Sequence, residues 1–350
     1  MNNKNIPVKI LASVAAFPDN RFLQKDIALK LGYNDGLRRS FFESSGIKQR
    51  ALFWPKNFNP RNESAPDAYR RGLKGLTALA ERSAKAALKT TGLDARLIDF
   101  LATTTSTVSA CPALDTALIG GLNLKTGVER LHISDIGSAA GVLAVKRAWD
   151  HLLAHPGGRA LITASEICSA CRVPGGNLSD AVGEALFADG AASVLISNHP
   201  KDSSKPGFEI LKGFSLVAPQ YGRFMRFDFT SNPRRFALSK EIRSLMGRLF
   251  QQFARRSIGP KIKSVKFWMI HPAGPKILDH IESLMDFHNT ELRFTRDVFR
   301  HHGNLASATS LVVLKNVMES KEPKTGDLAL LAAMGPGLGI EGLLLRWDQG

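Results

Sequence analysis

Ser138, His271 and Asn304 carry side chains that could together perform acyl transfer. Ser138 stands in "DIGSAAG", where Gly137 and the alanines that follow let a substrate approach the backbone of a predicted helix start. Free N–H groups at a helix start favour negative charge on a bound acyl oxygen. A serine hydroxyl is a nucleophile, an imidazole is a base or donor, and a carboxamide is a second donor to an oxyanion. Without its two partners, Ser138 is more simply a small residue that a helix start accommodates.

An internal repeat predicts that these residues belong to two copies of one βα unit. An offset of about 166 residues aligns "IDFLATTT" with "VKFWMIHP", and it also aligns Ser138 with Asn304. We therefore expect two halves, residues 1–205 and 206–350, packed around a pseudo-twofold axis. Ser138 and Asn304 would lie at equivalent helix starts, and His271 at the carboxyl end of a strand, where open α/β sheets build their sites.

Alternating strand and helix patterns predict an α/β fold. Apolar, β-rich runs are expected as strands at residues 100–104, 131–133, 160–164 and 192–197. Helical periodicity covers residues 74–91, ending at Gly92, and residues 139–155. The N-terminal run "ILASVAA" follows a lysine, as in a signal peptide, but because it is short we interpret it as a first strand.

Composition is that of a soluble globular protein, with 44% hydrophobic and 22% charged residues in a chain of 350. No apolar run reaches the roughly 18 residues that a membrane span needs, so none is expected. Three cysteines, an odd number in a long chain, indicate a reducing compartment, and we expect a cytoplasmic protein. The net charge of +16 favours anionic partners: nucleic acid, a membrane surface, coenzyme A phosphates or an acidic carrier protein.

Basic residues crowd into one stretch, with Phe224, Phe227 and Phe236 among them. Its cations are Arg223, Arg226, Arg234, Arg235, Lys240, Arg243, Arg248, Arg255 and Arg256. No helix-turn-helix, zinc-finger or single-strand-binding pattern accompanies them, so we do not expect a nucleic-acid partner. We expect part of the block to lie on the solvated face of a helix over residues 239–256 and the rest to meet phosphates or an acidic protein.

Four motifs, "HPAGPKILD", "HHGNLASATS", "ALFADGAAS" and "GPGLGIEGLLLRW", resemble the type III polyketide synthases, the chalcone synthase-like enzymes. The segments "ILASVAAFPDNRF" and "ESSGIKQRAL" also resemble the wider thiolase-fold group, including ketoacyl-carrier-protein synthase III. The resemblance implies a five-layered αβαβα fold, a homodimer, and acyl-coenzyme A or acyl-carrier protein as substrate. It implies no permanently bound cofactor and no metal.

In the family that the motifs resemble, a Cys, His, Asn triad accepts the acyl group and stabilises the enolate formed when malonyl extenders lose carbon dioxide. His271 and Asn304 match that triad, whereas Ser138 stands where the family has cysteine. Serine needs a general base during its attack, and its ester is a poorer acyl donor to carbon than a thioester. Three hypotheses follow: an acyltransferase or condensing enzyme acting through Ser138, an inactive partner subunit of an active homologue, or an engineered Cys-to-Ser form.

The resemblance also assigns residues that surround the substrate. Phe187 and Phe236 match two phenylalanines that gate the cavity, although either could simply be a core residue. The loop that lines the cavity matches Gly335, Pro336 and Gly337. Met334 stands where the family commonly has phenylalanine, so the cavity volume does not follow from the match.

The cysteines have roles by the same resemblance. Cys168 and Cys171 match pocket-lining positions, and Cys111 matches a residue that reaches into the neighbouring subunit. The spacing "CSAC" is also that of a redox or zinc half-site, but no second cysteine pair accompanies it. His301 and His302 would point to opposite sides of an extended chain, which is typical of surface or supporting residues rather than metal ligands.

Overall fold

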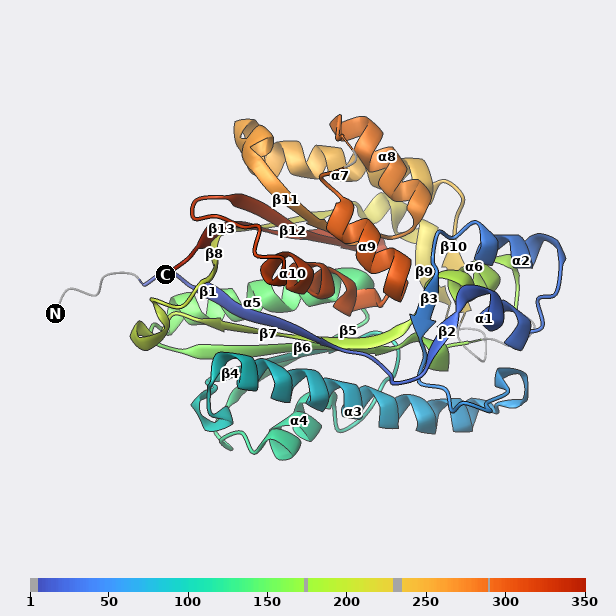
Figure 1. Ribbon diagram of the computed structural model, residues 1–350, viewed down its shortest axis with the longest axis horizontal. Helices are drawn as coiled ribbons and strands as arrows, with labels where there is room; N and C mark the ends of the chain where they lie inside the picture. The colour runs from blue at the N-terminus through green and yellow to red at the C-terminus, as the bar shows by residue number, and fades with distance from the viewer. Residues whose placement is uncertain (1–5, 173–175, 229–234, 289) are drawn as a thin grey trace.

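One nine-stranded mixed sheet runs through the computed structural model, which describes residues 6–172, 176–228, 235–288 and 290–350 (Figure 1). The strand order is β11-β12-β13-β8-β1-β7-β6-β4-β5. The strands are β1 (Lys9–Ala16), β4 (Phe100–Thr105), β5 (Glu129–Ser134), β6 (Arg159–Ile167), β7 (Asp189–Ser197), β8 (Gly207–Val217), β11 (Val265–Ile270), β12 (Leu328–Gly335) and β13 (Gly339–Asp348). β1 pairs with β8 only at Lys9 and Ile10, so the sheet has two parts, one from each half of the chain.

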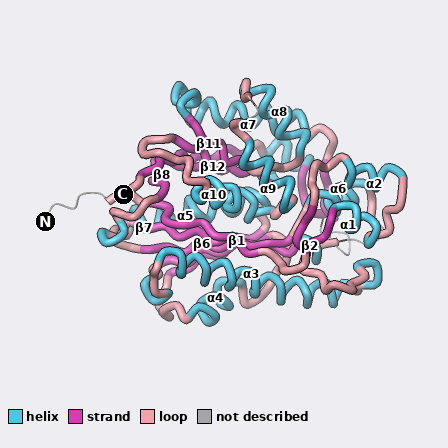
Figure 2. Tube along the Cα trace, in the orientation of Figure 1, coloured by secondary structure: helices cyan, strands magenta, loops and turns pink. Residues whose placement is uncertain are grey.

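Helices fill the space between the two parts and cover both outer faces (Figures 1 and 2). α5 (Ala140–Ala154) and α10 (Thr309–Glu319) pack against each other and against strands of both parts. α3 (Ala65–Thr91) and α4 (Leu114–Leu122) cover the N-terminal part, whereas α7 (Ile242–Ile258) and α8 (Pro275–Met285) cover the C-terminal part. The predicted five-layered αβαβα fold is therefore confirmed.

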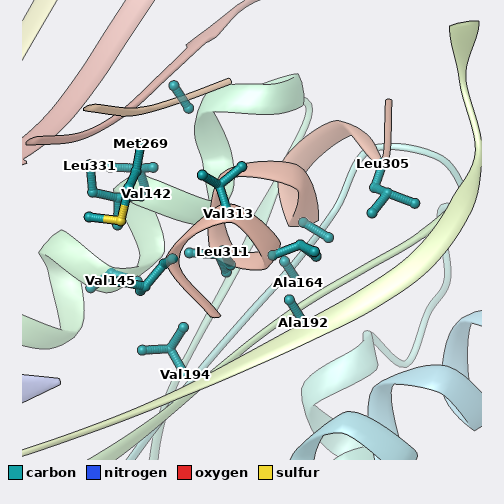
Figure 3. Packing of buried hydrophobic residues seen from close by; sticks show 14 of the residues in the cluster. Val142, Val145, Ala164, Ala192, Val194, Met269, Leu305, Leu311, Val313 and Leu331 are labelled. Carbon is teal, nitrogen blue, oxygen red and sulfur yellow. The ribbon is translucent and has the colours of Figure 1, made fainter. Parts of the chain in front are cut away.

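The two central helices are apolar on most of their surface because they are covered by sheet on both sides. Figure 3 shows Val142 and Val145 of α5 beside Leu311 and Val313 of α10, with Val194 of β7 nearby. All of these side chains are completely buried. Truncating one of them, such as Leu311→Ala, would cost about 2–5 kcal/mol of stability.

A cap of smaller elements covers one end of the layers (Figure 1). It contains β2 (Arg21–Leu23), α1 (Gln24–Lys30), α2 (Gly36–Glu43), β3 (Gln49–Ala51), α6 (Leu178–Leu186), β9 (Met225–Asp228) and β10 (Arg235–Leu238). α9 (Arg293–His302) packs beside it, against α10 and β11. α9 contacts β3, and α6 contacts α2 and β10, so segments from the whole length of the chain meet there. This end of the molecule holds the cavity described below.

The elements expected from the sequence are present: the strands and α3 have longer bounds, whereas α5 is one residue shorter at each end. α3 begins at Ala65, nine residues before the expected start, because Ser64 caps it by accepting from the N–H of Asp67. It ends as predicted at Gly92, which is left-handed with φ of 67°. β1 is a central strand, as the first apolar run suggested. No helix among the described residues is long and apolar enough to cross a membrane.

The internal repeat is present, but its offset differs from the one expected. The turns η3 (Gly137–Ala139) and η8 (Ala306–Ala308) precede α5 and α10, and β6 and β12 follow these helices. In each pair the second element begins 169 residues after the first. The counterpart of Ser138 is therefore Ser307, and Asn304 lies three residues earlier, in the segment that leads into the turn.

His301 and His302 correct a second expectation, because they lie in the last turn of α9 and not on an extended chain. His302 stacks on Phe17 with ring centroids 4.2 Å apart, and His301 Nδ1 lies 3.0 Å from a carboxylate oxygen of Asp297. The helix ends at Gly303, whose φ of 73° few other residues adopt. Both histidines are thus held by local packing.

Candidate active site

Ser138 lies in the turn η3 at the start of α5 and lines a cavity under the cap. Gly137, with φ of 67°, makes the bend that leads into this turn, and its N–H donates to Ser106 Oγ at 3.0 Å. A Cβ added at Gly137 would lie 2.3 Å from Pro336 Cδ, so only glycine fits this position. Ser138 is half-buried, and it is held on a tight turn that requires glycine at position 137.

Two further glycines bring the turn of Ser138 against the C-terminal half of the chain. A Cβ on Gly141 would lie 2.1 Å from the carbonyl oxygen of Ser307, and one on Gly335 would lie 2.5 Å from that of Ile136. The backbone of α5 thus packs directly on η8 and on the end of β12. Ala306 and Pro336 from those segments line the same cavity as Ser138.

His271 follows the last residue of β11, at the strand end where the sequence placed it. Its N–H donates to the carbonyl of Ala332 at 2.9 Å, and the residue is 1% exposed. Its Nδ1 has no hydrogen-bond partner within the described part of the chain. Burial lowers the pKa of His271 to about 3, because water cannot stabilise the imidazolium. The imidazole is therefore neutral at physiological pH.

Asn304 is held by its backbone and by one side-chain oxygen. Its N–H donates to Leu186 and its carbonyl accepts from Ala188, each at 2.8 Å. Its Oδ1 accepts from the N–H of Ala306 at 2.9 Å. Because the oxygen is engaged in this way, the amide nitrogen of the carboxamide is the group left to donate to a ligand.

Ser138, His271 and Asn304 are linked through the segments between them. Asn304 comes two residues before Ala306, and β12, which pairs with the strand of His271, ends against Ala139. Ser138 lines the cavity. His271 and Asn304 are buried, and they are not among the described residues of its wall. The segments that carry the hydroxyl, the imidazole and the carboxamide are therefore connected through β12 and the turn η8.

The cavity wall includes several of the residues that the sequence assigned to substrate binding. Phe187, Cys168, Cys171 and Pro336 line it. Gly335 packs against the turn of Ser138, and Gly337 adopts φ of 76° in the next turn. Phe236 lies on β10, where its backbone pairs with the cavity residue Phe227, but its side chain lies outside the described residues. Arg234 lies outside them as well.

The three cysteines lie in different surroundings. Burial, with the carboxylates of Glu166 and Asp189 nearby, raises the pKa of Cys168 well above its usual value. The thiol of Cys171 donates to the carbonyl of Thr107 at 3.0 Å. Cys111 is exposed in the loop between β4 and α4. Cys168 is therefore a protonated wall residue, and Cys171 lies in the same wall as a hydrogen-bond donor.

Glu166, at the end of β6, is a site residue that sequence reasoning missed. Its fully buried carboxylate accepts from the N–H of Ser106 at 3.0 Å, from Thr107 Oγ1 at 2.8 Å, and from the hydroxyl of Ser307. Burial raises its pKa, and these hydrogen bonds oppose that rise. The only sequence signal was a single acidic residue closing an apolar strand in "LITASEI".

The cap supplies the far wall of the cavity. Ile27 from α1, Leu31, which directly follows that helix, and Leu52 make it apolar. Arg172 and Glu184 add an ion pair there, with Arg172 Nε and Glu184 Oε1 2.9 Å apart. The wall therefore suits a chain or ring of carbon atoms, with a small number of polar groups to orient it.

The comparisons with known proteins agree with this geometry. The family model "FAE1/Type III polyketide synthase-like protein" matches residues 30–262, and "Chalcone and stilbene synthases, C-terminal domain" matches residues 231–347. A 1,3,6,8-tetrahydroxynaphthalene synthase of Streptomyces peucetius subsp. caesius is 29% identical over 97% of this chain and 93% of its own. A 3,5-dihydroxyphenylacetyl-CoA synthase of Streptomyces toyocaensis is 27% identical over 97% of this chain and 90% of its own.

Solved structures show the same fold. The crystal structure of 1,3,6,8-tetrahydroxynaphthalene synthase from Streptomyces coelicolor A3(2) superposes with a TM-score of 0.89 at 24% identity. The match covers 98% of this chain and 100% of that one. The polyketide synthase domain of Steely1 from Dictyostelium also reaches a TM-score of 0.89, at 24% identity over 97% of this chain and 99% of that one.

Proposed function

Because the chain belongs to the type III polyketide synthase family, we propose that it is an acyl-transferring, condensing enzyme that takes an acyl group onto Ser138. The acyl donor would be a coenzyme A thioester or an acyl-carrier protein. The observation that carries the proposal is the position of Ser138, on a glycine-bounded turn that opens into a cavity between the two halves.

In the first step, Ser138 Oγ attacks the thioester carbonyl while His271 removes the hydroxyl proton. A C–O bond forms, and the oxyanion accepts hydrogen bonds from the Asn304 amide nitrogen and from N–H groups of the turn. The C–S bond then breaks, and the departing thiolate takes the proton from His271. The enzyme is left with an acyl ester on Ser138 and a free thiol.

His271 is buried and neutral, which is the form of imidazole that can accept a proton from a serine hydroxyl. A cysteine nucleophile works as a thiolate beside an imidazolium, and burial disfavours that charged imidazole. A serine hydroxyl remains neutral until it attacks, and it needs a neutral imidazole as its base. The Ser138 hydroxyl and the buried His271 imidazole are therefore both uncharged before the attack.

The second step would pass the acyl group to an acceptor. A malonyl-type extender that loses carbon dioxide gives an enolate, and His271 and Asn304 would stabilise it, as the family resemblance implies. A serine ester is a weaker acyl donor to this carbon than a thioester, so we propose that condensation is slow relative to simple transfer to an alcohol, amine or thiol. The mainly apolar wall supports an aliphatic or aromatic acyl group.

We propose a homodimer, with a heterodimer of homologous subunits as its variant. β5 is an edge strand of the nine-stranded sheet, and edges of this kind are covered in stable proteins. Cys111 lies in an exposed loop and would face the second subunit. Light scattering during size-exclusion chromatography tests this directly: a monomer at micromolar concentration would contradict it.

A partner subunit without activity of its own is the second candidate, and the serine at the nucleophile position favours it. Chromatographic measurement of coenzyme A released from a panel of acyl donors separates the two. An active enzyme releases coenzyme A, and Ser138→Ala lowers the rate by roughly 100-fold or more. Ser244→Ala, an exposed serine on α7, is the matched control. The gene of the natural protein shows whether Ser138 is native.

A further inference from the structure

Arg50 on β3 is a completely buried cation at 1% exposure, and it lies on the cavity wall. Its Nε donates to Gln24 Oε1 at 2.9 Å, and its Nη1 donates to the carbonyl of Glu184 at 2.8 Å and to that of Phe187. Among the described residues no carboxylate is close enough to form an ion pair with it, although Asp189 and Glu184 attract its charge, and its Nη2 has no hydrogen-bond partner. Arg50 therefore uses its guanidinium to bind backbone carbonyls, which is an unusual use for a buried charge.

The carbonyls that Arg50 binds surround the end of α6. Glu184 lies in the last turn of that helix, and Phe187 follows its last residue. Between them stands Leu186, whose carbonyl accepts from the N–H of Asn304, and Ala188 donates to the carbonyl of Asn304. The segment that Arg50 holds is thus the same segment that holds the backbone of Asn304.

Arg50 also contacts this region from the other side. A Cβ on Gly303, which has φ of 73°, would lie 2.8 Å from Arg50 Cδ and 2.9 Å from the Leu186 carbonyl oxygen. Gly303 is therefore enclosed between the arginine stem and the end of α6. Asn304 follows directly, with its Oδ1 fixed by Ala306, so its position depends on how Gly303 and Leu186 are held.

We infer that Arg50 is a positioning residue, which sets the place of the Asn304 carboxamide without touching the substrate carbonyl itself. The inference rests on the proposed function, because it takes Asn304 as the donor to the oxyanion. Oxyanion donors act only when they are aimed at the developing charge, and misplacement by about 1 Å costs on the order of 100-fold in rate. Loss of the Arg50 contacts would produce such a displacement.

The test is a double-mutant cycle on the rate of acyl transfer, with Arg50→Lys, Asn304→Ala and the combined variant. Lysine keeps the charge, but its ammonium cannot bind carbonyls in the fork that a guanidinium spans. We expect Arg50→Lys to lower kcat by roughly 10-fold or more, with little change in KM for the acyl donor. In the Asn304→Ala background the same substitution should lower kcat less than about 3-fold.

Arg71→Lys is the matched control. Arg71 is also mostly buried and also binds a cavity turn, since its Nη1 donates to Ser169 Oγ at 2.8 Å, but its ion partner is Glu63. Its effect should multiply with that of Asn304→Ala. Effects of Arg50→Lys and Asn304→Ala that multiply in the same way would overturn the inference, because they would show that Arg50 contributes only general stability.

A crystal structure of Arg50→Lys decides the geometry without any activity. The inference requires the Asn304 carboxamide to be displaced relative to β12, and an unmoved carboxamide would overturn it. If no acyl donor reacts with the parent protein, the proposed function has failed, and this structure still tests the positioning role. Should Arg50→Lys fail to fold, Gly303→Ala presses on Arg50 and Leu186 from the opposite side and enters the same cycle and the same structural comparison.

Discussion

Glu166 and Ser307 come from opposite halves of the chain and share a hydrogen bond beside the turn that carries Ser138. The carboxylate of Glu166 also accepts from Ser106, which in turn accepts from the N–H of Gly137. Ser307 is the repeat counterpart of Ser138, and its carbonyl packs on Gly141. One buried carboxylate thus connects the two helix starts that frame the cavity.

The first prediction concerns Glu166→Gln. A glutamine amide offers one acceptor oxygen and two donors, so at least one of the hydroxyl or N–H donors now around Glu166 would lose its partner. We expect a loss of about 1–3 kcal/mol in the free energy of unfolding, measured by urea denaturation. Glu209→Gln removes an ion pair with the half-exposed Arg346 and should cost less than about 1 kcal/mol. Equal losses in the two variants would contradict the role given to Glu166.

The second prediction concerns the glycines between the two halves. Gly141→Ala places a Cβ 2.1 Å from the Ser307 carbonyl, which cannot move without displacing η8. We expect a loss of about 3 kcal/mol or more in stability, together with loss of acylation at Ser138. Gly120→Ala on α4 meets nothing within 4 Å, and it should raise stability by roughly 0.5–1 kcal/mol. Thermal unfolding of the two variants is sufficient to compare them.

The third prediction follows from the buried, neutral His271. Its pKa is about 3 in the folded chain against an ordinary value near 6.5, so the folded state binds fewer protons than the unfolded state between these pH values. Its contribution to stability is therefore complete above pH 6.5 and is lost as the pH falls toward 3, with a slope of about 1.4 kcal/mol per pH unit. His271→Gln should weaken this acid dependence.

Burial also lowers the pKa of His302, to about 4. His302→Gln should therefore weaken the acid dependence of stability in the same way, and it serves as a positive control for His271→Gln. Urea denaturation at several pH values gives the free energy of unfolding of each variant. The difference between the parent and His271→Gln should shrink as the pH falls from 6.5. A difference that stays constant over that range would show that His271 titrates normally.

The fourth prediction is the pH dependence of acylation. Because His271 is already neutral, the rate at which Ser138 is acylated should show no loss on the acid side between pH 5 and 8 from this histidine. In Ser138→Cys the rate should rise on the alkaline side as the thiol ionises near its ordinary pKa of about 8.5. Rapid-quench measurement of both proteins tests this, and a parent rate that falls tenfold from pH 7 to 6 would contradict it.

Local patterns in the sequence were enough to predict the layers of the fold. Apolar runs gave β4, β6 and β7, and Gly92 correctly marked the end of α3. α3 begins nine residues before the start that apolar periodicity predicts, because its polar first turns carry no such periodicity; Ser64 and Pro66 are the cap signals that mark the true start. The repeat is visible in the sequence, but aligning its chemically similar residues pairs Ser138 with Asn304, whereas the helices and strands themselves pair Ser138 with Ser307.

Single buried charges were the part of the site that the sequence could not reveal. Glu166 stands alone among apolar or small neighbours, and Arg50 follows Lys48 and Gln49 in an ordinary polar stretch, so no spacing indicates a partner for either. Their roles depend on hydrogen bonds to residues more than 100 positions away, such as Ser307 and Phe187. Hydrogen bonds between residues so far apart in the sequence depend on the topology of the fold, and no local sequence pattern predicts them.

The most direct test of acyl transfer through Ser138 is intact-protein mass spectrometry after incubation with acyl-coenzyme A and acyl-carrier-protein donors, followed by peptide mapping. We predict a mass increase of one acyl group, located on Ser138, stable to neutral hydroxylamine as an ester is, and absent from Ser138→Ala. An adduct on Cys168 or Cys171 would contradict it. So would a parent protein that takes up no acyl group while Ser138→Cys does, because the cavity would then bind the donor without a working nucleophile.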